Sequence, residues 1–315
     1  GESEDVCPLD CSRIIRKVLI LNFNPIIESE GNRRLSEVMS WNDPNQLFPE
    51  YIAHLNEISH NFVDYQIIEN QEIDAHPMKI DGFSYNDATF LECWNNRSKC
   101  HTPDNVDYYK ILEDYNVCGR LNRGEIDELW LFGYPYAGYW ESTLAGPNAF
   151  FYNSEPLSGT GCQKLLPIMG FNYERRVESM IHSFGHRAES TMKYIFGSWT
   201  GQSDHDWDKY TRNRGQSSDV EYFECGNIHY PPNGLQDYDY GNREYALSNC
   251  DSWLNYPYLQ NNVKNINCDE WECSQLGYMV WWHKHLPASS GKKDGIFNNW
   301  WIYLLDPNNI PITFE

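Results

Sequence analysis

The sequence predicts an α/β fold in which a mainly parallel sheet with covering helices occupies about the first 200 residues. A loop-rich, disulfide-stapled, aromatic second half is expected to pack onto it. Two observations predict this division. Up to about residue 200, strand-length apolar runs alternate with segments whose apolar residues have helical spacing. Beyond residue 200, Gly, Pro, Asn, Asp and Tyr accumulate. We therefore divide the chain into 1–200 and 201–315, and do not expect the second part to fold independently.

Four buried strands are expected in the first part. Residues 16–22 (RKVLILN) contain a continuous apolar run, as in a strand buried on both faces. Similar runs place the other strands at 62–68, 126–132 and 164–171. Helical spacing predicts helices at 45–58, 108–115 and 172–196, and a late helix at 275–285. The helix at 172–196 has Asn172 as its expected N-cap and Gly197 as its expected end.

In an open parallel sheet, ligands bind beyond the carboxyl ends of the strands. The side chains expected there are polar and aromatic: Asn22, Asn24, Glu69, Tyr134, Tyr136, Glu141, Asn172 and Glu174. We predict Tyr134, Tyr136, Asn24 and Arg187 as substrate-binding residues. No G-x-G-x-x-G follows the first strand and no P-loop occurs, which disfavours a nucleotide cofactor.

The composition limits the partners. The formal charge of −21 repels nucleic acids and anionic membrane surfaces, and no basic cluster offsets it. No apolar run reaches the ~18 residues of a membrane-spanning helix. We therefore expect a small-molecule, peptide or glycan partner, without nucleic acid binding or membrane insertion.

Ten cysteines, an even number, indicate an oxidising compartment. Cys93 with Cys100, and Cys268 with Cys273, are spaced to close small loops. The sequon Asn96-Arg97-Ser98 lies within the first loop and predicts surface glycosylation. We interpret the acidic opening GESED as a mature N-terminus and expect a secreted protein.

The helix at 172–196 carries the main functional signal. Glu178, His182, His186 and Glu189 fall within a sector about 80° wide at ~100° per residue. Two histidines at i and i+4 are spaced to bind one metal ion, and zinc is the ion that we expect. A solvated helix face is the alternative, because Ser183 stands where H-E-x-x-H metallopeptidases place their Glu.

A third ligand is needed. Glu189 lies ~10 Å along the axis from His182, too far for one ion unless the helix bends at Gly185. Gly185 can instead permit a close backbone approach. His229 is the better candidate, since a disulfide at Cys225 and two prolines would fix its position. His205, in a more acidic loop, is a weaker one.

Carboxylates near this centre suggest acid–base chemistry. Glu178 or Glu189 can act as general base on metal-bound water, and Glu141 is a further catalytic candidate. Asp237 and Asp239 alternate with tyrosines and can hold calcium, or form a tyrosine-rich turn.

The leading hypothesis is a secreted metal-dependent hydrolase acting on a peptide or glycan. A secreted oxygenase with a 2-His-1-carboxylate iron site, acting on a small aromatic molecule, is the second. The third is a non-catalytic carbohydrate-binding protein that uses exposed Trp and Tyr.

Overall fold

The computed structural model describes residues 13–197, 204–218 and 220–311. The chain forms two compact units. The sheet unit contains residues 16–51 and 65–183, and the aromatic unit contains residues 52–64 and the described residues from 184 onwards, together with 13–15. These units do not test whether 1–200 and 201–315 are domains, so that division stays a prediction.

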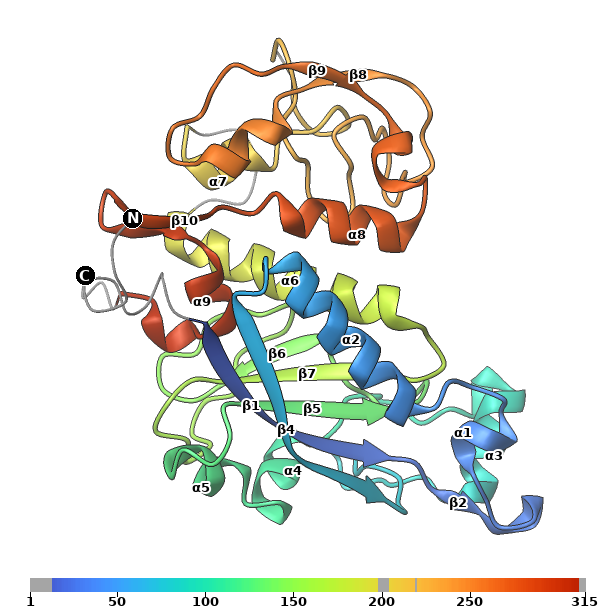
Figure 1. Cartoon of the computed structure of the whole chain (residues 1–315). Coiled ribbons are helices and arrows are strands. Elements are labelled where there is room, and N and C mark those ends of the chain that lie inside the picture. The colour runs from blue at the N-terminus through green and yellow to red at the C-terminus, as the bar shows by residue number, and fades with distance from the viewer. Residues whose placement is uncertain (1–12, 198–203, 219, 312–315) are drawn as a thin grey trace. The chain divides into compact units, whose positions relative to one another are not determined.

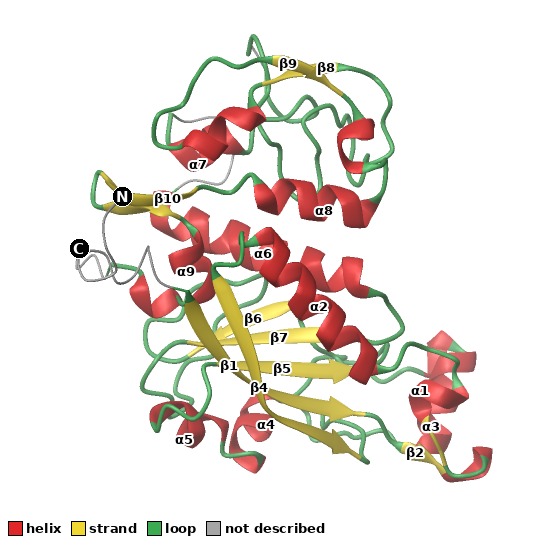
Figure 2. Ribbon diagram, in the orientation of Figure 1, coloured by secondary structure: helices red, strands yellow, loops and turns green. Residues whose placement is uncertain are grey.

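The sheet unit is built on a five-stranded sheet with strand order β4-β1-β5-β7-β6. Its strands are β1 (Ile14–Phe23), β4 (Val63–Ile73), β5 (Glu128–Gly133), β6 (Ser142–Ala145) and β7 (Leu166–Asn172). The β1–β5 and β5–β7 pairs are parallel, and β6 pairs antiparallel with β7 at the edge. Figure 2 shows these strands in yellow. The predicted α/β class and mainly parallel sheet are confirmed, and the antiparallel edge strand was not expected.

Helices and short elements connect these strands. They are β2 (Ile26–Ile27), η1 (Glu28–Glu30), β3 (Arg33–Arg34), α1 (Leu35–Val38), α2 (Pro44–Ile58), α3 (Asp87–Asn95), η2 (Arg97–Lys99), α4 (Tyr108–Asp114) and α5 (Val117–Asn122). Helices α4 and α5 lie together on one face of the sheet (Figure 1). Their apolar side chains pack on alternate residues of the central strands, including Leu19, Leu129 and Ile168. The opposite face receives Tyr51 of α2, whose ring centroid lies 5.1 Å from those of Trp130 and Phe171.

Burial on both faces explains the continuous apolar sequence of β1. The four residues from Val18 to Leu21 are all fully buried. A strand with one wet face would alternate apolar and polar residues instead.

The aromatic unit has little regular secondary structure. Its elements beyond α6 are α7 (Asp206–Tyr210), β8 (Ala246–Ser248), η3 (Cys250–Asn255), β9 (Lys264–Ile266), η4 (Cys268–Trp271), α8 (Gln275–Lys284), β10 (Ala288–Lys293), β11 (Ile296–Asn299), α9 (Trp301–Leu305) and η5 (Pro307–Asn309). The tryptophans supply its core, and those at most 9% exposed are Trp207, Trp253, Trp271, Trp281, Trp282, Trp300 and Trp301. Large aromatic burial replaces the regular sheet as the source of hydrophobic stabilisation here.

Four disulfides connect the described residues: Cys93–Cys100, Cys118–Cys162, Cys225–Cys250 and Cys268–Cys273. The two short loops predicted from sequence are among them. Cys7 and Cys11 lie outside the described residues. The four bonds suggest an oxidising, extracellular environment.

Helix α6 (Val177–Phe196) links the units, because the division falls between Ser183 and Phe184. It begins five residues after the predicted N-cap, Asn172. The Asn172 side chain instead accepts a hydrogen bond from the Glu174 amide at 3.0 Å and closes the turn after β7. At the other end, Gly197 adopts a left-handed φ of 74° as the expected terminator.

The aromatic core encloses an acidic side chain. Glu224 is 6% exposed, and the Trp253 Nε1–H donates to its Oε2 at 2.8 Å. Burial raises the pKa of the Glu224 carboxyl to about 7, against the lowering effect of the Trp253 hydrogen bond. The folded protein therefore binds a proton at this carboxyl more tightly than the unfolded chain does.

The expected consequence is a loss of stability as pH rises. As the pH rises from the ordinary pKa near 4.5 to the folded value of about 7, the buried Glu224 carboxyl resists ionisation. This should lower the free energy of unfolding by up to about 3 kcal/mol. The Glu224→Gln variant should lack this loss and exceed the native protein in stability at pH 8. Urea unfolding at pH 5 and pH 8 measures the difference. Exposed Glu221→Gln is the matched control, and an unchanged pH response in Glu224→Gln would contradict the assignment.

Candidate metal centre

Helix α6 presents the predicted pair of histidines on one flank. His182 and His186 are one turn apart, so the helix itself fixes their separation. His182 is 5% exposed, and the His186 side chain is 16% exposed. Burial of both rings argues against the solvated-face interpretation of this part of the helix.

Gly185 provides a close approach for a second segment. A Cβ at position 185 would lie 2.5 Å from Cγ2 of Ile228, inside van der Waals contact. The missing side chain therefore lets Ile228, which is fully buried, sit directly against the helix backbone. Of the two sequence-based explanations for this glycine, close approach is the one that the structure supports.

The segment that reaches the helix is held by hydrogen bonds on several sides. The Asn227 side chain accepts from the amides of His229 and Tyr230 at 3.0 and 2.9 Å. The hydroxyls of Tyr240 and Tyr278 donate to the carbonyls of Ile228 and Asn227 at 2.6 and 2.7 Å. Burial raises the pKa of both phenols, so they remain donors.

Just before this segment, Gly226 has φ +73°, and a Cβ there would meet the Tyr230 carbonyl at 2.2 Å. The Cys225–Cys250 disulfide ties its start to another part of the aromatic unit. These constraints place the His229 side chain.

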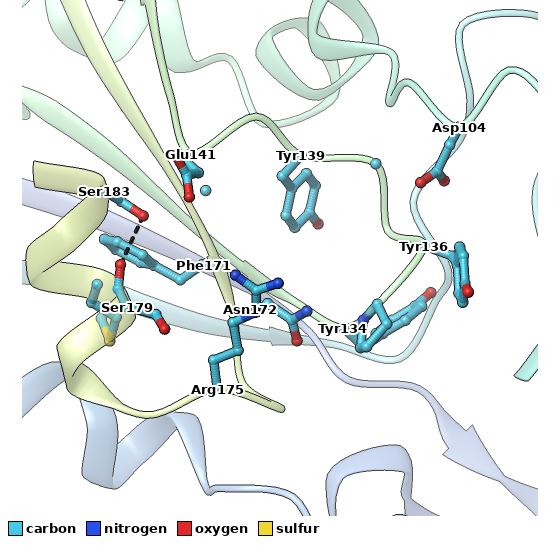
Figure 3. A pocket seen from close by; sticks show the side chains of 14 residues that line it. Asp104, Tyr134, Tyr136, Tyr139, Glu141, Phe171, Asn172, Arg175, Ser179 and Ser183 are labelled. Atoms are coloured by element: carbon cyan, nitrogen blue, oxygen red, sulfur yellow. Dashed lines mark hydrogen bonds between the residues drawn. The ribbon is translucent and has the colours of Figure 1, made fainter. Parts of the chain in front are cut away.

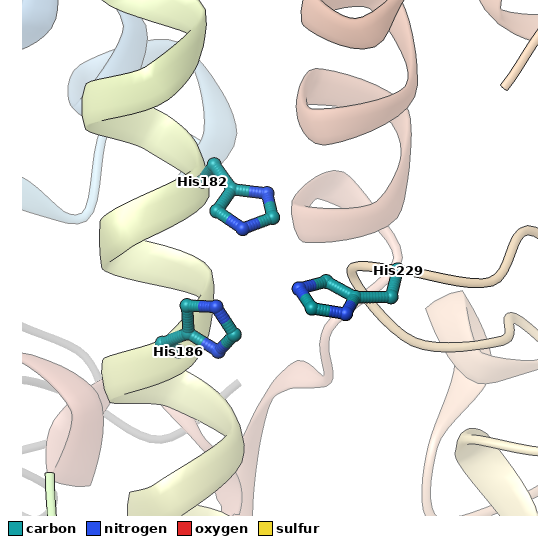
Figure 4. A group of neighbouring side chains, drawn as sticks. All are labelled: His182, His186 and His229. Atoms are coloured by element: carbon teal, nitrogen blue, oxygen red, sulfur yellow. The ribbon is translucent and has the colours of Figure 1, made fainter. Parts of the chain in front are cut away.

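Three imidazoles meet as a result. His182, His186 and His229 each offer one ring nitrogen, and the three nitrogens lie within 4.8 Å of one another. The rings of His186 and His229 have centroids 5.1 Å apart. Figure 4 shows the rings of His182 and His186 projecting from α6 toward the ring of His229. This group can hold a metal ion.

Carboxylates orient two of the three rings. Glu189 accepts from the Ile228 amide through Oε1 at 3.2 Å, and its Oε2 lies 3.3 Å from His186 Nδ1. Asp237 Oδ1 lies 3.4 Å from His229 Nδ1. A carboxylate on the second nitrogen of a histidine fixes its tautomer and strengthens it as a metal ligand.

The second candidate group in the described residues consists of Cys268, Asp269 and Cys273. Its two cysteines are joined in a disulfide, so their sulfurs are not available as thiolate ligands. The predicted calcium pair is also engaged elsewhere. Asp237 contacts His229, and Asp239 accepts from the Leu235 amide at 3.0 Å within the turn.

Other predicted site residues are not members of this group. Glu178 is partly exposed in the first turn of α6, one turn before His182. Arg187 is fully buried and donates to the Leu305 carbonyl at 3.0 Å. Asn24 is buried, and it donates to Ser36 Oγ and accepts from the Ser36 amide, both at 3.0 Å. These contacts give Arg187 and Asn24 structural roles, and their substrate contacts stay predictions.

Three predicted residues meet in a separate cavity of about 280 Å³ inside the sheet unit. Tyr134, Tyr136 and Glu141 line it, beyond the carboxyl ends of β5 and β7. Figure 3 shows the lining side chains. The cavity therefore lies where open parallel sheets usually bind their ligands.

The sequence did not reveal the charged residues that contact the lining of this cavity. His76 Nδ1 hydrogen-bonds with the Tyr134 hydroxyl at 2.5 Å, and His76 Nε2 lies 3.5 Å from Asp87. The ammonium of fully buried Lys79 donates to Asp104 Oδ1 at 2.7 Å. Burial lowers the pKa of both His76 and Lys79, against the opposing effect of their carboxylate partners. No spacing in the sequence connects these partners, because only the fold brings their loops together.

Comparison with family models, curated proteins and solved structures finds no match to this chain. Within the described residues, none of the helices combines the length and apolar character that a membrane crossing requires.

Substitution of Gly185 tests how the site is assembled. Gly185→Ala should force Ile228 away from α6 and displace His229, weakening metal binding about tenfold or more. Gly241→Ala is the control, because a Cβ there meets nothing within 4 Å. Metal titration of both variants measures the effect. Equal affinities would show that the close approach does not position His229.

Proposed function

We propose that this protein is a secreted zinc-dependent hydrolase whose metal ligands are His182, His186 and His229. The observation that carries the proposal is the convergence of three ring nitrogens within 4.8 Å. Three protein ligands and an open fourth position are the usual arrangement of catalytic zinc. Structural zinc sites, by contrast, use four protein ligands.

The nature of the third ligand favours zinc over iron. The iron oxygenase alternative requires two histidines and one carboxylate. Glu189 is the nearest carboxylate on the helix, but its two oxygens face the Ile228 amide and the His186 ring. An imidazole, from His229, is the third member of the group, and three imidazoles suit zinc.

A bound zinc ion would supply a water of lowered pKa and polarise the bond to be cleaved. Glu178 is the proposed general base, since it lies one turn before His182 and its carboxylate is partly exposed. Glu189 is proposed to orient His186 rather than to accept a proton from water. Asp237 is proposed to do the same for His229.

The substrate is proposed to be an extracellular peptide or glycan. The four disulfides support function outside the cytosol. The charge of −21 disfavours nucleic acid and anionic membrane surfaces as substrates.

Metal content is the first test. Protein secreted in zinc-containing medium should carry one zinc per chain by elemental analysis, and His186→Ala should lose at least nine tenths of it. His54→Ala, which alters a histidine that pairs with Glu57, should keep full occupancy. Equal zinc content in the native protein and His186→Ala would contradict the proposal.

The carboxylates should separate metal binding from catalysis. Glu189→Gln and Asp237→Asn should each weaken zinc binding about 10- to 100-fold, because each removes the negative charge that orients a ligand. Glu178→Gln should bind zinc normally but lose hydrolytic activity. Competition with a chromophoric chelator and assays on peptide and glycan libraries measure the two effects. Normal zinc affinity in both Glu189→Gln and Asp237→Asn would refute the orienting role.

A further inference from the structure

The cavity in the sheet unit has the features of a small-ligand site. Its volume is about 280 Å³, at the small end of ligand pockets. None of the three histidines of the metal group lines it. The cavity therefore needs an explanation of its own.

One cation faces this cavity without a partner. Among the described residues, the Arg175 guanidinium makes no hydrogen bond or ion pair, although its backbone is fixed in the turn between β7 and α6. Its amide donates to the Asn172 carbonyl, and its own carbonyl accepts from Asn42, both at 3.0 Å. Figure 3 draws the Arg175 side chain, which is exposed, among those that line the cavity.

An amide donor also faces the cavity. The Tyr139 hydroxyl does not, because water cannot reach it, although it has no hydrogen-bond partner within the described part of the chain. The Asn172 side-chain oxygen accepts from Glu174, which leaves its amide group as a further donor toward the cavity.

The remaining lining completes the chemistry. Aromatic faces come from Tyr134, Tyr139 and Phe171, and Ser179 adds a hydroxyl. The Glu141 carboxylate, also in the lining, accepts from Asn153 at 2.6 Å and can accept from a ligand hydroxyl. The lining therefore combines one cation and an amide donor with the carboxylates of Glu141 and Asp104, the second of which pairs with Lys79.

We propose that this cavity binds a small carboxylic acid that carries hydroxyl groups, of the size of one hexuronic acid. The carboxylate pairs with Arg175, where a bidentate contact is available to a planar guanidinium. The Asn172 amide donates to a ring oxygen, and one hydroxyl donates to Glu141. The apolar face of the ring lies against the aromatic side chains.

Binding of sugar acids to the whole protein tests the proposal. Calorimetry and saturation-transfer NMR with glucuronate and galacturonate should show binding at millimolar concentration or tighter, with neutral glucose at least tenfold weaker. Arg175→Gln should reduce uronate affinity at least tenfold. Arg176→Gln, an exposed neighbour outside the cavity lining, should not.

Each other outcome overturns the proposal. Equal binding of glucose and glucuronate, or equal losses in Arg175→Gln and Arg176→Gln, would exclude recognition of the carboxylate by Arg175. Binding of glutamate without binding of either uronate would assign the cavity to amino acids. If no probe binds at concentrations 50-fold above the expected range, the cavity does not bind ligands of this class. Chelator-treated protein should give the same affinities, so failure here is distinct from failure of the metal proposal.

Discussion

The contact between Gly185 and Ile228 is the constraint on which the candidate metal centre depends. A glycine in the middle of α6 costs ~1 kcal/mol relative to alanine, but it lets the Ile228 side chain pack against the helix backbone next to His229. Glu189 strengthens the same contact, because it accepts from the Ile228 amide while facing His186. Position and orientation of the imidazoles thus arise from one local packing arrangement.

Helix α6 also contributes side chains to two separate sites. His182 and His186 lie on one flank, while Ser179 and Ser183 line the cavity of the sheet unit from the adjoining flank, about 60° away. Both sites therefore depend on the rotational setting of a single helix. The hydrogen-bonded turn from Asn172 to Arg175, which leads β7 into α6, helps to establish that setting.

The strands and site residues that depend on short-range sequence patterns could be predicted from the sequence. Four strands of the sheet and the His182–His186 pair on α6 follow from periodicity and spacing, and His229 follows from the disulfide and prolines beside it. The start of α6 could not, because Asn172 caps a turn rather than a helix. The roles of Glu189 and Asp237 depend on contacts with residues far away in the sequence. The same holds for Lys79 and Asp104, and for Tyr139, whose unpaired hydroxyl is visible only in three dimensions.

X-ray absorption spectroscopy at the zinc edge, on protein purified with its metal, tests the central claim most directly. The account predicts a first shell of three imidazole nitrogens at about 2.0–2.1 Å and one oxygen from water. It also predicts loss of one imidazole in His229→Ala. A first shell dominated by sulfur or carboxylate oxygen, or one unchanged in His229→Ala, would contradict the three-histidine centre.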